Sequence, residues 1–272
     1  MYVPDRLAMQ PGKFRKGICI MSKRYSNRGV NAAIREREAA AEAASARRHV
    51  AIIGGIGVGV LALIIVVAVV LASLPKQGEA DMEAIKAEIN SMELSDFTET
   101  DKTTDYVRIT VKNHGDIVLR LRSDIAPKTV KNFKKLVAEG FYDGLMFHRI
   151  MEGFMMQGGD PKGDGTGGSA NKIKGEFLQN GVRNDLSHIK GVISMARGGQ
   201  DMNSASCQFF ICNADASASL DGKYAGFGYV VAGLETVDSA SSVEVKANAD
   251  GEISVPVTPV IIEKVTFVKK AA

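Results

Sequence analysis

Cysteine is scarce in this chain, with three residues in 272. Cys19 lies near the N-terminus, and Cys207 and Cys212 lie five positions apart in a segment typical of a β-strand. An odd separation along a strand points two side chains to opposite faces of the sheet, so we expect no disulfide between them. No set of residues has the spacing of metal ligands. The sequence therefore predicts neither a disulfide-stapled domain nor a metal centre.

The motifs of common covalent and nucleotide-dependent enzymes are also missing. The sequence has no G-x-S-x-G elbow and no P-loop, and neither His148 nor His188 has a serine or cysteine in a known nucleophile context. Residues 163–168, GDGTGG, fit G-x-G-x-x-G, but they follow a polar turn and open no amphipathic helix. We interpret them as an ordinary glycine-rich loop.

Charge is absent from residues 50–74, an apolar run of 25 residues. As a helix this run would be about 37 Å long, enough to cross a hydrocarbon core of about 30 Å. Residues 1–49 carry eleven Lys and Arg against four acidic residues, whereas residues 75–103 carry three against eight. The positive-inside rule then predicts a single-pass anchor with a cytoplasmic N-terminus and an extracytoplasmic C-terminal domain.

Three features of the N-terminal part leave alternatives open. Cleavage after Ala72 would turn the run into a signal peptide, but the run exceeds the usual apolar length of about 7–15 residues, which favours an uncleaved anchor. Met21 is a second possible start. Residues 31–48 carry no aromatics among their charges, which favours contact with anionic lipid over nucleic acid. Residues 75–103 are acidic and indicate a stalk.

A single β-rich domain is predicted over residues 104–270. Apolar and polar residues alternate over 107–111 and 117–121 around an Asn-His-Gly-Asp turn, which predicts a hairpin. Residues 126–140 predict a helix that begins near Pro127, buries one apolar face and stops at Gly140. Several short apolar strands separated by glycine-rich loops follow, which is typical of a closed β architecture.

Arg149 is the centre of the candidate site. It lies in FHRIMEGFMMQGGD (147–160), near apolar residues and the amides of Gln157 and Gln208, with no evident nucleophile or acid/base pair. A fixed hydrogen-bond donor beside an apolar pocket suits rotation about a prolyl amide, which needs no proton removal. The residues alone are equally compatible with a peptide-binding groove that has no turnover.

The domain resembles the cyclophilins, a family of peptidyl-prolyl cis-trans isomerases. The resemblance lies in FHRIMEGFMMQGGD, GDGTGG, GVISMARGGQDMNSASCQFFICNA and LDGKYAGFGYVVAGLETVD, in matching order over residues 104–270. It implies an eight-stranded antiparallel closed β-barrel capped by two helices, here preceded by one transmembrane helix. It also implies isomerase activity on Xaa-Pro bonds without cofactor or metal, with unfolded proline-containing polypeptides as partners and no nucleic acid.

The same resemblance assigns the site residues. Arg149 takes the catalytic position, Gln157 orients it, and Phe154 is grouped with them at the catalytic centre. The residues expected to bind the substrate are Met155, Phe210, Leu220, Ala196, Arg197, Gln208, Gly165, Tyr224 and His148, although a lone histidine such as His148 is more often structural. Ser219 stands where many eukaryotic members have a tryptophan that helps hold cyclosporin, and Tyr224 resembles bacterial members.

The whole sequence therefore predicts a bacterial, membrane-anchored isomerase that assists the folding of exported or envelope proteins. The competing hypothesis is a membrane-tethered module or chaperone that binds proline-containing peptides without significant turnover.

Overall fold

The computed structural model describes residues 77–271 together with Ala40 and Ala43. Apart from these two alanines the basic arm lies outside the described residues, as do the predicted anchor at residues 50–74 and the possible cleavage site at Ala72. Among the residues that are described, no helix combines the length and apolarity needed to cross a membrane. Residues 75–272 form one compact unit, and the fold below is that of this unit.

The main sheet contains nine strands, eight of which close into a barrel in the order β11-β2-β3-β8-β6-β7-β5-β4, with β4 pairing back to β11. Each neighbouring pair is antiparallel, and β1 is added to the end of β11. The strands are β1 (Phe97–Glu99), β2 (Tyr106–Val111), β3 (Gly115–Leu121), β4 (Met146–Met151), β5 (Met155–Gly158), β6 (Val192–Met195), β7 (Phe209–Cys212), β8 (Ala225–Ala232) and β11 (Val260–Lys270). The predicted eight-stranded antiparallel barrel is confirmed.

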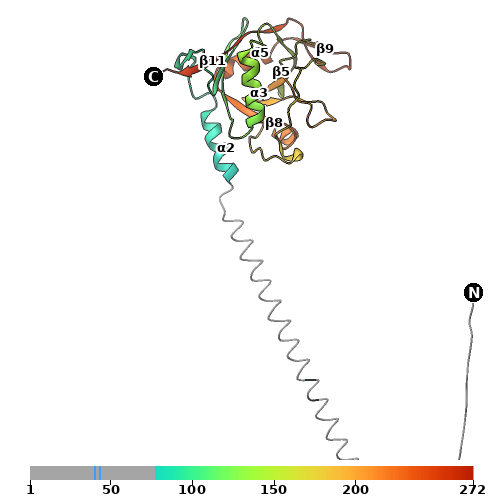
Figure 1. The fold of residues 1–272 in the computed structure, drawn as a ribbon. Coiled ribbons are helices and arrows are strands. Elements are labelled where there is room, and N and C mark those ends of the chain that lie inside the picture. The colour runs from blue at the N-terminus through green and yellow to red at the C-terminus, as the bar shows by residue number, and fades with distance from the viewer. Residues whose placement is uncertain (1–39, 41–42, 44–76, 272) are drawn as a thin grey trace, which may run out of the picture. The chain divides into compact units, whose positions relative to one another are not determined.

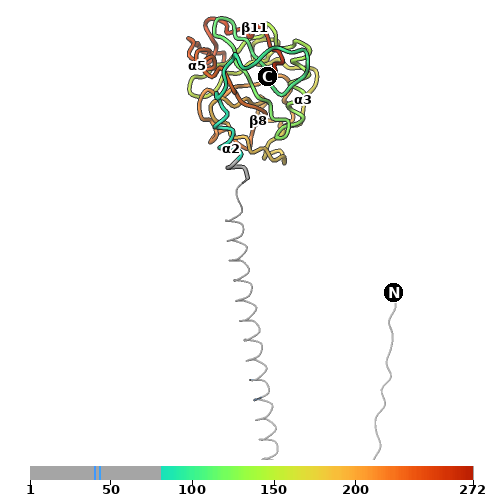
Figure 2. Tube along the Cα trace, turned by 90° about the vertical axis from the view of Figure 1, so that its left-hand side faces the viewer, coloured from blue at the N-terminus to red at the C-terminus, as the bar shows by residue number. Residues whose placement is uncertain are grey.

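The elements outside the barrel are short. A separate hairpin pairs β9 (Val245–Ala247) with β10 (Ile253–Pro256). The helices of the described part are α2 (Gln77–Glu88), α3 (Pro127–Ala138), α4 (Ser217–Leu220) and α5 (Leu234–Ser241), with 3-10 turns η1 (Leu94–Asp96) and η2 (Leu178–Asn180). Figure 1 shows α3 in green against the barrel, and in Figure 2 α3 and α5 lie on opposite sides of it.

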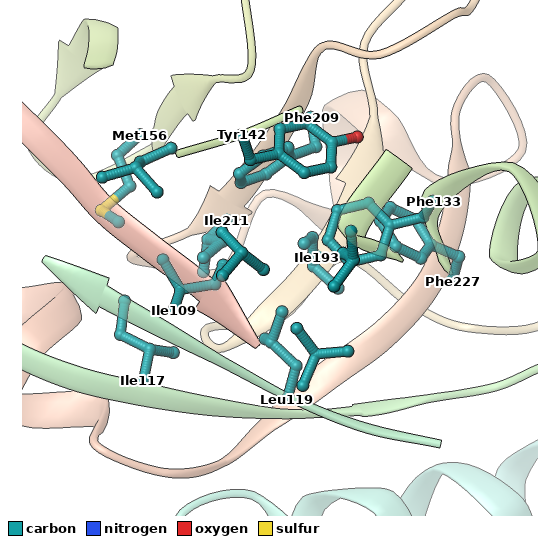
Figure 3. Close-up of a cluster of buried hydrophobic side chains, with 14 of the residues drawn as sticks. Ile109, Ile117, Leu119, Phe133, Tyr142, Met156, Ile193, Phe209, Ile211 and Phe227 are labelled. Carbon is teal, nitrogen blue, oxygen red and sulfur yellow. The ribbon is translucent and has the colours of Figure 1, made fainter. Parts of the chain in front are cut away.

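The predicted hairpin and helix form for the expected reasons. In β2 the residues at 107, 109 and 111 are buried and those between them are partly exposed, and Ile109 pairs with Ile117 of β3. Helix α3 begins at Pro127 and buries its apolar face, and the chain leaves it through Gly140 at φ 65°. That face meets the barrel core, where the Phe133 ring lies 5.1 Å from that of Phe227 (Figure 3).

The described part of residues 75–103 differs from the predicted stalk. Ile85 of α2 and Phe97 of β1 are 3% and 4% exposed and belong to an apolar cluster with barrel residues of β3, β6, β8 and β11. Glu88 at the end of α2 accepts hydrogen bonds from Arg120 Nη1 at 2.6 and 2.5 Å and from the Tyr229 hydroxyl at 2.6 Å. The segment therefore packs on the barrel, because Met82 and Ile85 lie on the helix face that meets it while Asp81 and Glu83 are exposed.

Candidate active site

Arg149 lies in β4 beside a β-bulge. Phe147 pairs with Gly158 and Arg149 with Gln157, so His148 is the extra residue on β4. Strict alternation would send Phe147 and Arg149 to the same face of the sheet. The bulge allows both Phe147 and Ile150 to enter the core and leaves the Arg149 side chain outside it, 30% exposed.

A chain of side-chain amides connects Arg149 to the glycine-rich loop. Arg149 Nη1 lies 3.5 Å from Gln157 Oε1, and Gln157 Nε2 donates to Gln208 Oε1 at 2.8 Å. Gln208 Nε2 in turn donates to the carbonyl oxygens of Gly165 at 3.0 Å and Gly167 at 2.7 Å. The two glutamines therefore fix each other's orientation, and the first of them faces the guanidinium.

The glycine-rich loop is built on Asp160, which is 1% exposed. Its carboxylate accepts hydrogen bonds from the amides of Lys162 at 2.9 Å and Gly165 at 2.6 Å. A Cβ at Gly167 would lie 1.8 Å from Asp160 Oδ1, so only glycine fits there. The residues that directly follow the loop form no helix. The loop therefore serves to border the site, in agreement with its interpretation from the sequence.

An apolar cluster lies next to the guanidinium. Its buried members are Met155, Phe210, Cys212, Ala216 and Leu220, and its partly buried members are Met151, Phe154, Ala196 and Tyr224. Arg149 Nη1 is 3.8 Å from Met155 Sδ. Neighbouring Phe209 belongs to the barrel core instead, so the two phenylalanines face opposite sides of β7. The cluster offers an apolar surface of the kind a pyrrolidine ring requires.

Four of the residues predicted to bind the substrate line a groove next to Gln157. They are Ala196, Arg197, Gln208 and Gly165. The Ala196 amide donates to the Gln208 carbonyl at 2.9 Å. The guanidinium of Arg197 lies 4.8 Å from the centre of the Tyr224 ring and donates to the Lys223 carbonyl at 3.1 Å. Arg197 therefore packs on the groove wall.

His148 is the predicted contact that the structure does not bring to the apolar cluster or the groove. It is 7% exposed, and among the described residues neither ring nitrogen has a hydrogen-bond partner. A Cβ at Gly165 would lie 3.7 Å from its Nε2. Burial lowers the pKa of His148, so the ring is neutral near pH 7. Because His148 is the extra residue of the bulge, its side chain lies against the glycine-rich loop at Gly165 and not in the apolar cluster.

His188 packs against Phe210 of the apolar cluster, a contact that the sequence did not indicate. Its ring stacks on Phe210 at 6.0 Å between centroids. Its Nδ1 lies 2.8 Å from Asp221 Oδ1 and its Nε2 lies 2.9 Å from Ser194 Oγ. Ser194 is fully buried, so this set holds Phe210 in place and presents no accessible nucleophile.

Glu252 is the second residue that sequence reasoning missed. Its carboxylate accepts hydrogen bonds from Arg149 Nε at 2.6 Å and Nη2 at 2.7 Å. The hydrogen-bonded guanidinium lowers the pKa of Glu252 to about 2. The two residues are 103 positions apart, and no local motif connects them.

Comparisons with known proteins agree with this geometry. Residues 106–267 match the family model described as cyclophilin type peptidyl-prolyl cis-trans isomerase/CLD. The chain is 46% identical over 121 residues to a peptidyl-prolyl cis-trans isomerase of Schizosaccharomyces pombe, covering 44% of this chain and 75% of that protein. It is 44% identical over 128 residues to one of Helicobacter pylori, covering 46% of this chain and 74% of that protein.

A solved structure gives the same result. The crystal structure of a Cryptosporidium parvum cyclophilin, obtained in the presence of the dipeptide Ala-Pro, aligns with a TM-score of 0.51 and 31% identity, covering 59% of this chain and 97% of that one. The family match spans more than half of this chain and coincides with the barrel. The chain therefore belongs to the cyclophilin-type peptidyl-prolyl cis-trans isomerases.

Proposed function

We propose that Arg149 is the catalytic residue and that it donates a hydrogen bond to the prolyl amide nitrogen. Rotation about this bond has a barrier of about 18–20 kcal/mol because the nitrogen lone pair is conjugated with the carbonyl. In the twisted state the lone pair leaves conjugation and can accept a hydrogen bond. A donor that contacts the lone pair only in this twisted state stabilises the transition state more than the ground state.

The observation that carries this proposal is the position of Arg149 Nη1. It lies beside Met155 in the apolar cluster, and its near neighbours are a thioether and an amide oxygen at 3.5 Å. The thioether is a weak acceptor, and the amide oxygen lies at the long limit of hydrogen-bond distance, so neither holds the Nη1 hydrogens strongly. Phe154, Met155, Phe210 and Leu220 would hold the proline ring, while Gln157, Gln208 and the Ala196–Arg197 segment would contact the peptide on either side. A related protein crystallised with Ala-Pro supports a proline-containing ligand.

The proposed setting is the outer face of a bacterial cytoplasmic membrane, with residues 50–74 as the anchor in membrane lipid. The uncharged run and the opposite charges of its two flanks support this topology. The substrates would be exported or envelope proteins whose folding is limited by slow prolyl isomerisation. Protease added to cells stripped of their wall should remove the isomerase domain, and protection of the domain would contradict the topology.

The catalytic proposal is tested on the full-length chain in a mild detergent with an Xaa-Pro peptide. We expect Arg149→Ala to lower kcat/KM by about 10²–10³, the usual loss when a transition-state donor is removed. Arg149→Lys keeps the charge without the planar fork and should recover only part of the rate. A wild-type rate in Arg149→Ala would reject the role of Arg149. Peptide binding by a wild-type chain that has no turnover would favour the tethered binding module.

A further inference from the structure

Glu252 is held in a hydrogen-bonded turn that joins β9 to β10. Asn248 Oδ1 accepts hydrogen bonds from the amides of Asp250 and Glu252, both at 2.9 Å, and the Asn248 amide donates to the Glu252 carbonyl at 2.8 Å. Ser254 and Pro256 of β10 are buried, so the strand that follows the turn is anchored. The position of the Glu252 carboxylate is therefore set by the hairpin.

The ion pair engages only one edge of the guanidinium. Glu252 takes a hydrogen from Nε and one from Nη2 of Arg149, which is the parallel two-bond arrangement that fixes the plane of an arginine. The second Nη2 hydrogen faces Met151 Sδ at 3.2 Å. The opposite edge, Nη1, is left facing Met155 and Gln157. One strong acceptor thus occupies the Nε–Nη2 edge of the guanidinium and leaves Nη1 to Met155 and Gln157.

We propose that Glu252 is a positioning residue, which holds the Arg149 guanidinium so that Nη1 points at the bound proline. The inference rests on the proposed catalytic role of Arg149 and deepens it. A free arginine side chain samples many rotamers, and only a few of them place Nη1 beside the apolar cluster. Because Glu252 selects such a rotamer before substrate binds, the donor meets the reacting nitrogen without a further ordering cost.

The proposal predicts an effect on the isomerisation step with little effect on binding or stability. Glu252 is not among the residues that line the groove beside Gln157. The two side chains of the pair are 30% and 33% exposed, so solvent screens their attraction and limits what the pair contributes to folding stability. A residue that only stabilised the hairpin would instead change thermal stability when replaced.

The test is exchange NMR on an Xaa-Pro peptide with the full-length chain in detergent, which gives both the isomerisation rate of the bound peptide and its Kd. We expect Glu252→Ala to slow isomerisation roughly tenfold with Kd changed less than twofold and Tm unchanged. Glu252→Gln keeps one acceptor oxygen and should lose about two- to threefold. Asp250→Ala removes a negative charge two residues away and should behave as wild type. An unchanged or faster rate in Glu252→Ala would overturn the proposal.

A double-mutant cycle separates this inference from the catalytic proposal. If Glu252 acts only through Arg149, the variant Arg149→Ala/Glu252→Ala should be no slower than Arg149→Ala alone. Additive losses would show that Glu252 acts by another route and would overturn the inference. If Arg149→Ala isomerises the peptide slowly and Glu252→Ala at the wild-type rate, the role of Glu252 is rejected and that of Arg149 is retained. A normal Arg149→Ala would remove the catalytic proposal itself.

Discussion

Phe97 and Ile85 should contribute strongly to the stability of the isomerase domain, although the composition of residues 75–103 predicts a solvated stalk. Phe97 is 4% exposed and its ring lies 5.3 Å from that of Tyr106, while Ile85 is 3% exposed in the same cluster. Truncation of buried side chains of these sizes costs about 3–5 kcal/mol for phenylalanine and about 2–5 kcal/mol for isoleucine. For a domain of this size each kcal/mol corresponds to about 2–4 °C in Tm, so Phe97→Ala should lower Tm by about 6–20 °C.

Scanning calorimetry of the full-length chain measures this effect, with isomerase activity at low temperature as a second readout. Because the cluster under α2 is separate from the one beside Arg149, the folded fraction of Phe97→Ala should keep the wild-type rate. Glu83→Ala on the same helix is the control, since its side chain is 73% exposed and its loss should change stability by less than about 0.5 kcal/mol. A Tm for Phe97→Ala within about 1 °C of wild type would refute the packing argument.

Three further results are expected. Glu176 is 3% exposed and accepts hydrogen bonds from two amides and a hydroxyl in the first turn of α3, so Glu176→Ala should lower the free energy of unfolding in urea by about 1–3 kcal/mol. The hydrogen bond from Arg149 lowers the pKa of Glu252 from 4.5 to about 2, so the ion pair should persist from neutral pH down to about pH 3 and break as the pH falls through about 2; the NMR signal of the Arg149 Nε–H measures this. With Ser219 in place of tryptophan, cyclosporin should inhibit weakly, and nanomolar inhibition would contradict this expectation.

Local patterns in the sequence predicted a closed β architecture, and the resemblance to the cyclophilins supplied the number of strands and the roles of the site residues. Period-two alternation identified β2 and β3 as a hairpin with the correct buried residues. The spacing of Val130, Phe133 and Val137 identified the buried face of α3. These features depend on neighbours within a few residues, which is why a single sequence reveals them.

The features that were missed depend on contacts between distant parts of the chain. The apolar residues Met82, Ile85 and Ile89 have helical spacing, but their acidic neighbours obscured the face that packs on the barrel. The bulge that displaces His148 is set by pairing between β4 and β5, and strict alternation could not reveal it. Glu252 reaches Arg149 from a hairpin 103 residues further along the chain. No pattern within either segment points to the other.

The geometry of the site follows from the register of four strands. Arg149 pairs with Gln157, Gln157 with Phe210, and Phe210 with Ser194, so one row across β4, β5, β7 and β6 holds the catalytic candidate, its amide neighbour and the floor of the apolar cluster. Residues paired across adjacent strands point to the same face, and a slip of one residue would turn them into the core. The bulge beside Arg149 sets this row without removing Phe147 and Ile150 from the core. Strand pairing in the barrel therefore places a hydrogen-bond donor beside an apolar surface. In the proposed role, Glu252 fixes only the plane of the Arg149 guanidinium.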